Sequence, residues 1–107
     1  MQFNHFLSSY MPDPSIGSKK HFKNMTEQAI LAEKLGYCSV SIPEHHLVNL
    51  LMMPSPLQMA VKIATLTNKI KVVTSVGVLP LHDMRIYAGE VATADILTEG
   101  RLVLGVG

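Results

Sequence analysis

The sequence predicts an α/β protein in which strands and helices alternate along the chain. Short apolar runs that end at proline or glycine alternate with segments whose apolar residues recur every three or four positions. Each strand and helix pair occupies roughly thirty residues, which suits the right-handed crossover between parallel strands. The run Ile70-Lys71-Val72-Val73-Thr74-Ser75-Val76 is rich in β-branched residues, as is typical of a parallel strand covered on both faces.

The first strand and helix are expected within residues 3–36. Residues 3–8 form the predicted strand, and Pro12-Asp13-Pro14 follow it as a loop because proline and aspartate favour turns. From about residue 20 a helical stripe begins, and Gly36 is expected to end the helix because glycine accepts the left-handed conformation. The stripe consists of Phe22, Met25, Ala29, Ala32 and Leu35.

Residues 38–42 are predicted to form the second strand, which Pro43 ends because proline cannot donate to a sheet ladder. A loop rich in leucine and methionine follows at residues 47–56. The second helix is expected to begin near Ser55-Pro56, a cap residue followed by proline at the first helical position. Its apolar face carries Leu57, Ala60, Val61 and Ala64.

The third strand is expected at residues 70–79, closed by Pro80, and the third helix at residues 83–97. Asp83 is the candidate N-cap of that helix, and residues 101–106 form the predicted fourth strand. One stripe of the helix holds Tyr87, Val91 and Ala94. Four strands and three helices fit either the first half of a closed eight-stranded (β/α)8 barrel, which needs ~250 residues, or a small open sheet.

The stretch Ile42-Pro43-Glu44-His45-His46 is the first candidate for a functional site. It places three ionisable side chains just past the carboxyl end of a predicted strand, where open and closed parallel α/β folds bind their ligands. A histidine suits catalysis there because its unperturbed pKa near 6.5 lets it give or accept a proton at neutral pH.

Composition narrows the class of protein further. The chain has 48% apolar and 16% charged residues and a net charge of +1, without blocks of either sign, so nothing favours binding to nucleic acid or to an anionic membrane. Cys38 is the only cysteine, which suits a reducing compartment. The N-terminal residues lack the pattern of a signal peptide, and we expect a cytoplasmic protein.

Along its whole length the chain resembles the bacterial luciferase-like, flavin-dependent monooxygenase family. Four segments in the right order carry the resemblance: Ala32-Glu33-Lys34-Leu35-Gly36-Tyr37, Ser41-Ile42-Pro43-Glu44-His45-His46, Val76-Gly77-Val78-Leu79-Pro80-Leu81, and Gly89-Glu90-Val91-Ala92-Thr93-Ala94-Asp95-Ile96-Leu97-Thr98-Glu99-Gly100-Arg101-Leu102. The family folds as a TIM barrel, so the resemblance implies that residues 1–107 are an N-terminal part of such a β/α barrel domain.

The resemblance also implies a reaction. The family uses reduced FMN, or in some branches a deazaflavin, supplied by a separate flavin reductase, and oxidises a small organic substrate with O2. The first histidine of the family's Glu-His-His motif affects the flavin chemistry most, and here it is His45. His46 is the second catalytic candidate, and Glu44 is a candidate cofactor-binding neighbour.

The carboxyl end of the third strand passes close to the flavin in family members, often with a cis peptide bond that does not involve proline. The matching bond is Ser75-Val76, which we expect to be cis, and both residues are candidates for cofactor binding. Family members also dimerise through the second and third helices, which implies a homodimer through residues 57–66 and 87–94.

Two departures limit what is carried over. The family commonly has His-Pro after the third strand, whereas this chain has His82-Asp83, so no role is assigned to His82. The groups that grip the cofactor's phosphate in this family lie largely beyond residue 107.

Three alternatives stay open. A metal-dependent hydrolase would use His5, Glu44, His45 and His46 as ligands, although no spaced ligand motif is present and we assign no metal site. A non-catalytic flavin-binding or interaction protein would keep the family's core without a working site. An open doubly wound fold could use Gly105-Val106-Gly107 in a dinucleotide loop, but that fingerprint needs a third glycine.

Overall fold

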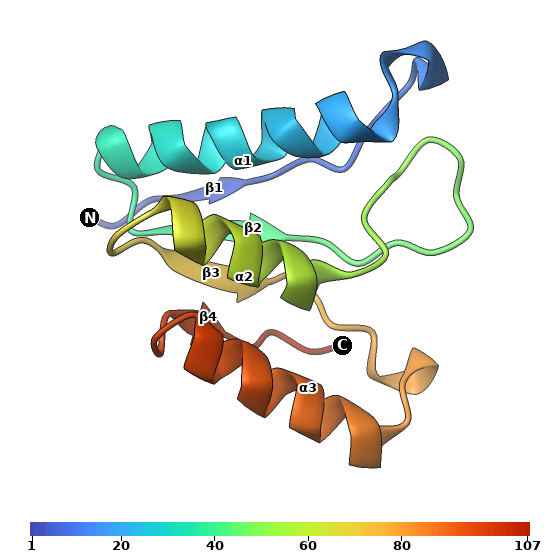
Figure 1. Cartoon of the computed structure of the whole chain (residues 1–107), viewed down its shortest axis with the longest axis vertical. Helices are drawn as coiled ribbons and strands as arrows, with labels where there is room; N and C mark the ends of the chain where they lie inside the picture. Colours follow the sequence, from blue (N-terminus) through green and yellow to red (C-terminus); the bar gives the residue numbers. More distant parts are fainter.

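The computed structural model describes residues 1–107 and contains one four-stranded parallel sheet with three long helices (Figure 1). The strands follow one another in the order β1-β2-β3-β4, each hydrogen-bonded to the next. The elements are β1 (Asn4–Phe6), the 3-10 helix η1 (Pro14–Ile16), α1 (Ser18–Lys34), β2 (Ser39–Ile42), α2 (Pro56–Leu66), β3 (Lys71–Thr74), the 3-10 helix η2 (Leu79–Leu81), α3 (Met84–Leu97) and β4 (Leu102–Val103). The predicted alternation of strands and helices is confirmed.

The core lies between the sheet and the helices, because alternate strand residues face α1 and α2. Val40, Ile42 and Val72 are fully buried there, and Figure 1 shows α2 lying across β2 and β3. Most of the predicted helix stripes also face this core, which contains Met25, Ala29, Ala32, Ala60 and Ile63. Leu35 does not, and its 67% exposure follows from its position after the last residue of α1.

The opposite face of the sheet carries small polar side chains. Ser39 donates to Asn4, and Asn4 donates to Ser41, so β1 and β2 are joined by side chains as well as by backbone. His5, one residue further along β1, points to the helix side, where its ring contacts Gln28 of α1 at 3.1 Å. His5 therefore does not belong to the turn that carries Glu44, and its place in a metal-ligand set was wrong.

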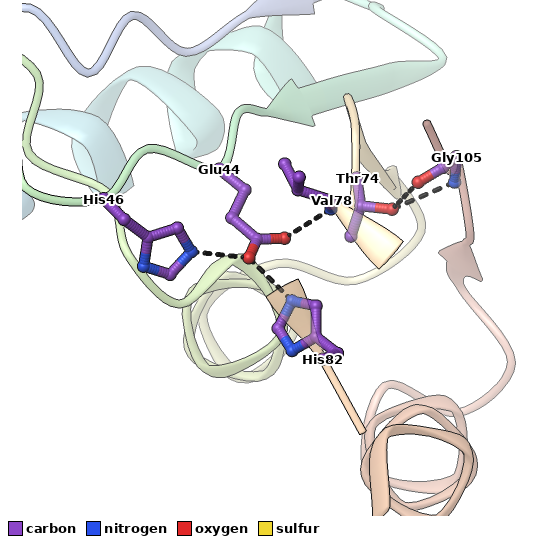
Figure 2. A network of polar contacts seen from close by, with 6 residues as sticks. All are labelled: Glu44, His46, Thr74, Val78, His82 and Gly105. Atoms are coloured by element: carbon purple, nitrogen blue, oxygen red, sulfur yellow. Dashed lines mark hydrogen bonds and ion pairs between the residues drawn. The ribbon is translucent and has the colours of Figure 1, made fainter. Parts of the chain in front are cut away.

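The strands are shorter than the sequence predicts. β3 ends at Thr74 rather than at residue 79, and β4 is limited to two residues instead of residues 101–106. The reason is visible in Figure 2: the Thr74 hydroxyl donates to the carbonyl of Gly105 at 2.8 Å and accepts from its N–H at 2.9 Å. This side-chain contact interrupts the backbone ladder after Thr74, and backbone pairing resumes where Gly77 meets Gly105 and Gly107.

The helix ends agree well with the sequence. Asp83 caps α3 by accepting from the N–H of Arg85, and Pro56 occupies the first position of α2. Gly36 and Gly100 follow α1 and α3 with φ of 86° and 74°, the left-handed conformation that glycine adopts readily. Ser55 stands at the N-cap of α2 without a capping hydrogen bond from its side chain.

One charged cluster ties α1 to the loop between α2 and β3. The Glu33 carboxylate accepts hydrogen bonds from three successive backbone N–H groups, those of residues 68–70, at 2.8–3.1 Å. The Arg101 guanidinium, which precedes β4, donates to the carbonyls of Ala64 and Thr67 and to the Thr67 hydroxyl. Together these two side chains hold the amino ends of β3 and β4 against the helix layer.

Two glycine substitutions test how closely the segments that follow β3 and β4 approach each other. Gly105→Ala is expected to lower the free energy of unfolding by about 2 kcal/mol, because the new Cβ would overlap the backbone carbonyl of Thr74. Gly89→Ala, inside α3 with open space around the position, is the matched control and is expected to raise stability by about 0.5–1 kcal/mol. Urea denaturation measures both, and equal effects would contradict the packing at Gly105.

None of the helices combines the length and the apolar character needed to cross a membrane.

Candidate functional site

The turn after β2 is built around the buried carboxylate of Glu44. Ile42 ends β2, Pro43 follows, and the Glu44 side chain turns inward with no exposed surface. Both oxygens are occupied: Oε2 accepts from the backbone N–H of Val78 at 2.8 Å, and Oε1 lies 2.6 Å from His46 Nε2 and 2.7 Å from His82 Nε2 (Figure 2). The carboxylate therefore joins the turn after β2 to the segment after β3.

Two opposing effects act on the Glu44 carboxyl. Burial favours its neutral form and works to raise the pKa, while hydrogen bonds from His46, Val78 and His82 and the charge available on His82 favour the ionised form. The hydrogen bonds prevail, and the pKa of Glu44 lies below its ordinary value. At neutral pH the turn is thus organised around a buried negative charge with three donors.

His45 lies apart from this network. Its backbone N–H donates to the carbonyl of Met53 at 2.8 Å in a short antiparallel bridge, and no hydrogen bond engages its half-buried ring. Side chains alternate along an extended segment, so His45 points away from the side on which Glu44 and His46 meet. The turn therefore presents one histidine that is held by hydrogen bonds and one whose ring nitrogens are both open.

Ser75 and Val76 lie beside this turn at the end of β3. The Ser75 N–H donates to the carbonyl of Ile42 at 2.7 Å, which joins the carboxyl ends of β2 and β3. The Ser75–Val76 peptide bond is cis, as the resemblance implied. Both side chains are exposed, Val76 by 39%. The Val76 side chain thus stands exposed at the carboxyl edge of the sheet next to the Glu-His-His turn.

An exposed aliphatic side chain at this edge suits contact with a flat aromatic cofactor such as a flavin. The exposed Val76 side chain can pack against a ring system, and the Gly107 backbone passes so close to Val76 that a Cβ there would lie 2.8 Å from Val76 Cγ2. The Glu44 carboxylate, in contrast, has no free oxygen to offer a ligand. Ser75 and Val76 therefore fit contact with a cofactor, whereas Glu44 fits a supporting position behind it.

A groove of about 690 Å³ runs between α2 and α3 and reaches Glu44 and His82. Tyr87 of α3 lines it and stacks on the His82 ring, with 4.2 Å between ring centroids and 21° between planes. Burial, helped by the negative charges of Glu44 and Glu90, raises the pKa of the Tyr87 hydroxyl, which has no hydrogen-bond partner. A Cβ at position 77 would lie 2.5 Å from this hydroxyl, so any residue other than glycine there would require the Tyr87 side chain to shift.

Sequence reasoning missed His82, Val78 and Tyr87. His82 was set aside because the residue after it is aspartate rather than proline, yet its ring reaches Glu44 across 38 positions of sequence. The Val78 contribution is a backbone N–H, which leaves no mark in the residue type. Tyr87 was predicted as a core residue of α3, which is correct, but its stacking on His82 depends on how η2 turns back towards the helix.

No group of three or more histidine, cysteine, aspartate or glutamate side chains is arranged to hold a metal ion. His5 lies on the helix side, and both histidines that meet Glu44 use their Nε2 atoms for hydrogen bonds to its oxygen. The side-chain positions therefore give no support to the metal-dependent hydrolase.

Parallel strands joined by helices, with ionisable side chains gathered at the carboxyl ends of neighbouring strands, define a β/α-barrel type of chain with its site at the usual edge. A family model described as luciferase-like monooxygenase matches residues 1–107. The chain belongs to this family.

Curated relatives agree with the family. The chain is 37% identical over 107 residues to an uncharacterized protein of Sinorhizobium fredii, covering 100% of this chain and 30% of that protein. It is 28% identical over 106 residues to the oxygenase component of a flavin-dependent trigonelline monooxygenase of Acinetobacter baylyi, covering 99% of this chain and 29% of that protein. The chain thus spans about 30% of the length of these relatives.

Solved structures confirm the fold. The oxygenating constituent of 3,6-diketocamphane monooxygenase from Pseudomonas putida, in complex with FMN, matches with a TM-score of 0.92 and 25% identity, over 100% of this chain and 29% of that one. An F420-dependent secondary alcohol dehydrogenase bound to an F420-acetone adduct matches with a TM-score of 0.78 and 25% identity, over 99% of this chain and 31% of that one. The predicted barrel class is confirmed, and the open doubly wound fold was wrong.

Proposed function

We propose that this chain is part of a flavin-dependent monooxygenase that uses reduced flavin and O2 to oxidise a small organic substrate. The observation that carries the proposal is the exposed Ser75–Val76 segment beside the Glu-His-His turn, at the carboxyl edge where β2 and β3 meet. Family membership and the flavin dependence named for a relative support it. Residues 1–107 would then be one portion of a single barrel domain.

Each site residue has a proposed part in this reaction. Ser75 and Val76 would hold the flavin, since both are exposed at the edge of the sheet. His45 is the catalytic residue, because both nitrogens of its ring are open to exchange a proton with a bound group. His46, on the opposite side of the turn from His45, is the second proposed catalytic residue. Glu44 holds the turn in place rather than touching the cofactor, because its carboxylate has no exposed surface.

The flavin, when bound, would supply the electrons that activate O2, and the chain supplies the surroundings. The exposed Val76 side chain would contact the flavin and help to keep water away from it. The ring of His45 holds or releases a proton at the edge of the site. The Glu44 network fixes the backbone from which His45 projects, so that this ring does not have to be ordered when substrate arrives.

A comparison of two histidine variants tests this function. Purified protein is supplied with FMN and a flavin reductase, and oxygenated product is followed over a panel of aldehydes and ketones. His45→Ala is expected to lower turnover by about 100-fold or more, the contribution typical of a general acid or base, while reduced FMN still binds in anaerobic dialysis. His5→Ala is the matched control, because His5 faces α1, and is expected to leave turnover unchanged.

The same assay separates the proposed enzyme from the alternative of a non-catalytic flavin-binding protein. Binding of reduced FMN without turnover by the unaltered protein would favour the alternative. A parallel titration with reduced F420 decides between FMN and a deazaflavin, since the matched structures include complexes with each kind of cofactor. Tighter binding of F420 would replace FMN in the proposal and leave the site unchanged.

We also propose a homodimer through α2 and α3. These helices expose large apolar side chains, among them Leu66, Met84, Ile86 and Leu97, and Ile86 and Leu97 line the groove between the two helices. The alanine-rich face expected on α2 does not contribute, because Ala60 and Ala64 are buried against the sheet. The contact would therefore rest mainly on α3 and on the rim of the groove.

The double variant Ile86→Glu with Leu97→Glu is expected to convert the dimer to a monomer. Both side chains are exposed, by 62% and 56%, so the charges should not disturb the core, whereas they would be buried in the dimer contact. Light scattering after gel filtration gives the mass. Leu31→Glu, on an exposed position of α1, serves as the control, and a dimer that survives the double variant would refute the interface.

The remaining expectations are that a flavin reductase delivers the reduced cofactor, that neither nucleic acid nor membrane is a partner, and that the protein is cytoplasmic. The even charge balance supports the absence of a polyanionic partner.

A further inference from the structure

His82 is held from two directions at the start of α3. Its Nε2 atom lies 2.7 Å from Glu44 Oε1, and the same oxygen lies 2.6 Å from Nε2 of His46. The flat side of its ring stacks on Tyr87. The side chains of His46 and His82 are exposed by 34% and 22%, whereas the carboxylate between them is fully buried. A single buried oxygen therefore joins two partly exposed imidazoles.

The position of the protons follows from this geometry. An ionised carboxylate only accepts hydrogen bonds, so each Nε2 atom that contacts Oε1 must carry a hydrogen. In its neutral form an imidazole has one N–H, so in that form Nδ1 of each ring is the unprotonated acceptor. Neither Nδ1 atom has a partner within the chain. His46 therefore presents an open nitrogen that can accept a proton, and the contact of its Nε2 atom with Glu44 decides that this nitrogen is Nδ1.

We propose that His82 is a positioning residue: acting through Glu44, it fixes the turn that carries His45 and His46, while the Glu44 contact itself leaves Nδ1 as the open nitrogen of His46. The part of this inference that concerns the reaction rests on the proposed function, while the tautomer and the orientation of the turn do not. His82 touches neither His45 nor Ser75, so its effect passes through the carboxylate.

The Glu44 carboxylate has only three anchors, and they come from two segments. His46 belongs to the same turn as Glu44 and cannot fix that turn relative to the rest of the fold. The remaining two anchors are the Val78 N–H and the His82 ring, both after β3. Without His82, Oε1 contacts only His46. The hydrogen bond from the Val78 N–H to Oε2 is then the only contact that the carboxylate keeps outside the turn, and the carboxylate can rotate about it. The Glu44 side chain then loses one of its two supports from outside the turn, while the backbone hydrogen bonds of His45 to Met53 and of Ser75 to Ile42 remain.

The first experiment measures the histidine tautomers by 15N NMR of the purified protein, which needs no cofactor. We expect His46 and His82 to carry their hydrogen on Nε2 with an unprotonated Nδ1. In His82→Leu, His46 keeps its own contact with Glu44 and therefore the same tautomer, but its ring signals should broaden because the Glu44 side chain has lost a support after β3. His82→Gln should restore sharp signals, because its side-chain amide can donate from about the same position. His46 protonated on Nδ1 in the unaltered protein would overturn the inference without any variant.

The second experiment measures turnover with FMN and a flavin reductase for the same variants. His82→Leu is expected to lower kcat by about 10- to 100-fold, the size of loss that a misplacement of about 1 Å causes, with KM for reduced FMN changed less than twofold. His82→Gln should recover most of kcat, and His5→Leu is the histidine control. Equal kcat for the Leu variant and the unaltered protein would overturn the positioning role. If the unaltered protein shows no flavin turnover, the proposed function fails, and the NMR result still decides whether His82 sets the turn.

Discussion

Glu44→Ala is expected to lower the free energy of unfolding by about 3–4 kcal/mol, a large part of the stability of a small domain. The carboxylate is the shared acceptor for His46, His82 and the Val78 N–H. Its removal leaves the Val78 donor without a partner, and a buried donor without a partner costs about 1–3 kcal/mol by itself. Loss of the link between the turn after β2 and the segment after β3 adds to this cost.

Urea denaturation with circular dichroism measures this difference. Glu90→Ala is the matched control, because Glu90 is an exposed glutamate of α3 without a hydrogen bond to another side chain. Its replacement is expected to change stability by less than about 0.5 kcal/mol. A Glu44 variant as stable as the Glu90 variant would show that the carboxylate does not organise the turn.

The sequence was sufficient for the helices and for the location of the candidate site. The spacing of Met25, Ala29 and Ala32 predicts a buried stripe because residues three and four apart share one helix face. Glu44 was placed correctly after β2 because proline ends a strand whatever the tertiary context. Local chemistry decides such features, and local chemistry can be seen in the sequence.

The strand ends and the partners of Glu44 could not be predicted in the same way. β3 ends at Thr74, where the hydroxyl pairs with the backbone of Gly105, 31 positions later, and backbone pairing resumes only at Gly77. Nothing in a run of β-branched residues indicates where a distant glycine will replace the ladder. The His82 contact is of the same kind, since it spans 38 positions and depends on the path of η2. Both were missed because they depend on contacts between segments that are far apart in the sequence, and not on the residues of either segment alone.

The cis bond at Ser75–Val76 was anticipated by a third route. Neither serine nor valine favours a cis peptide, and the expectation came only from the resemblance to a family in which this bond lies next to the flavin. The structure has the bond in the expected place. His45, by contrast, stays a prediction as the catalytic residue, because its open ring is compatible with that role without requiring it.

Glu33→Ala is expected to lower the free energy of unfolding by about 2–3 kcal/mol at pH 7, and the loss should shrink as the solution is acidified. The carboxylate accepts from the backbone N–H groups of residues 68–70, of which Ile70 is buried and cannot turn to water instead. Burial works to raise the pKa of Glu33, but these N–H groups and the charge of Arg101 outweigh it and hold the pKa below its ordinary value of 4.5.

The pH dependence has a definite sign. Because the pKa of Glu33 is lower in the folded chain than in the unfolded chain, acidification protonates the unfolded chain first. The stabilisation from Glu33 is therefore complete above about pH 4.5 and disappears as the pH falls through the lower, folded value. The Ala variant has no such group, so its stability should approach that of the unaltered protein in acid. Glu44 titrates in the same direction in both proteins and cancels when the two are subtracted.

Urea denaturation of both proteins between pH 7 and pH 3 gives this difference directly. Glu27→Ala provides the control, since Glu27 is exposed on the same helix and meets only Lys23, at 3.6 Å; an exposed pair of this kind contributes little. If the difference in the free energy of unfolding between the unaltered protein and Glu33→Ala stayed constant from pH 7 to pH 3, the N–H groups would not be holding an ionised carboxylate. In that case shape and packing, rather than charge, would join α1 to the amino ends of β3 and β4.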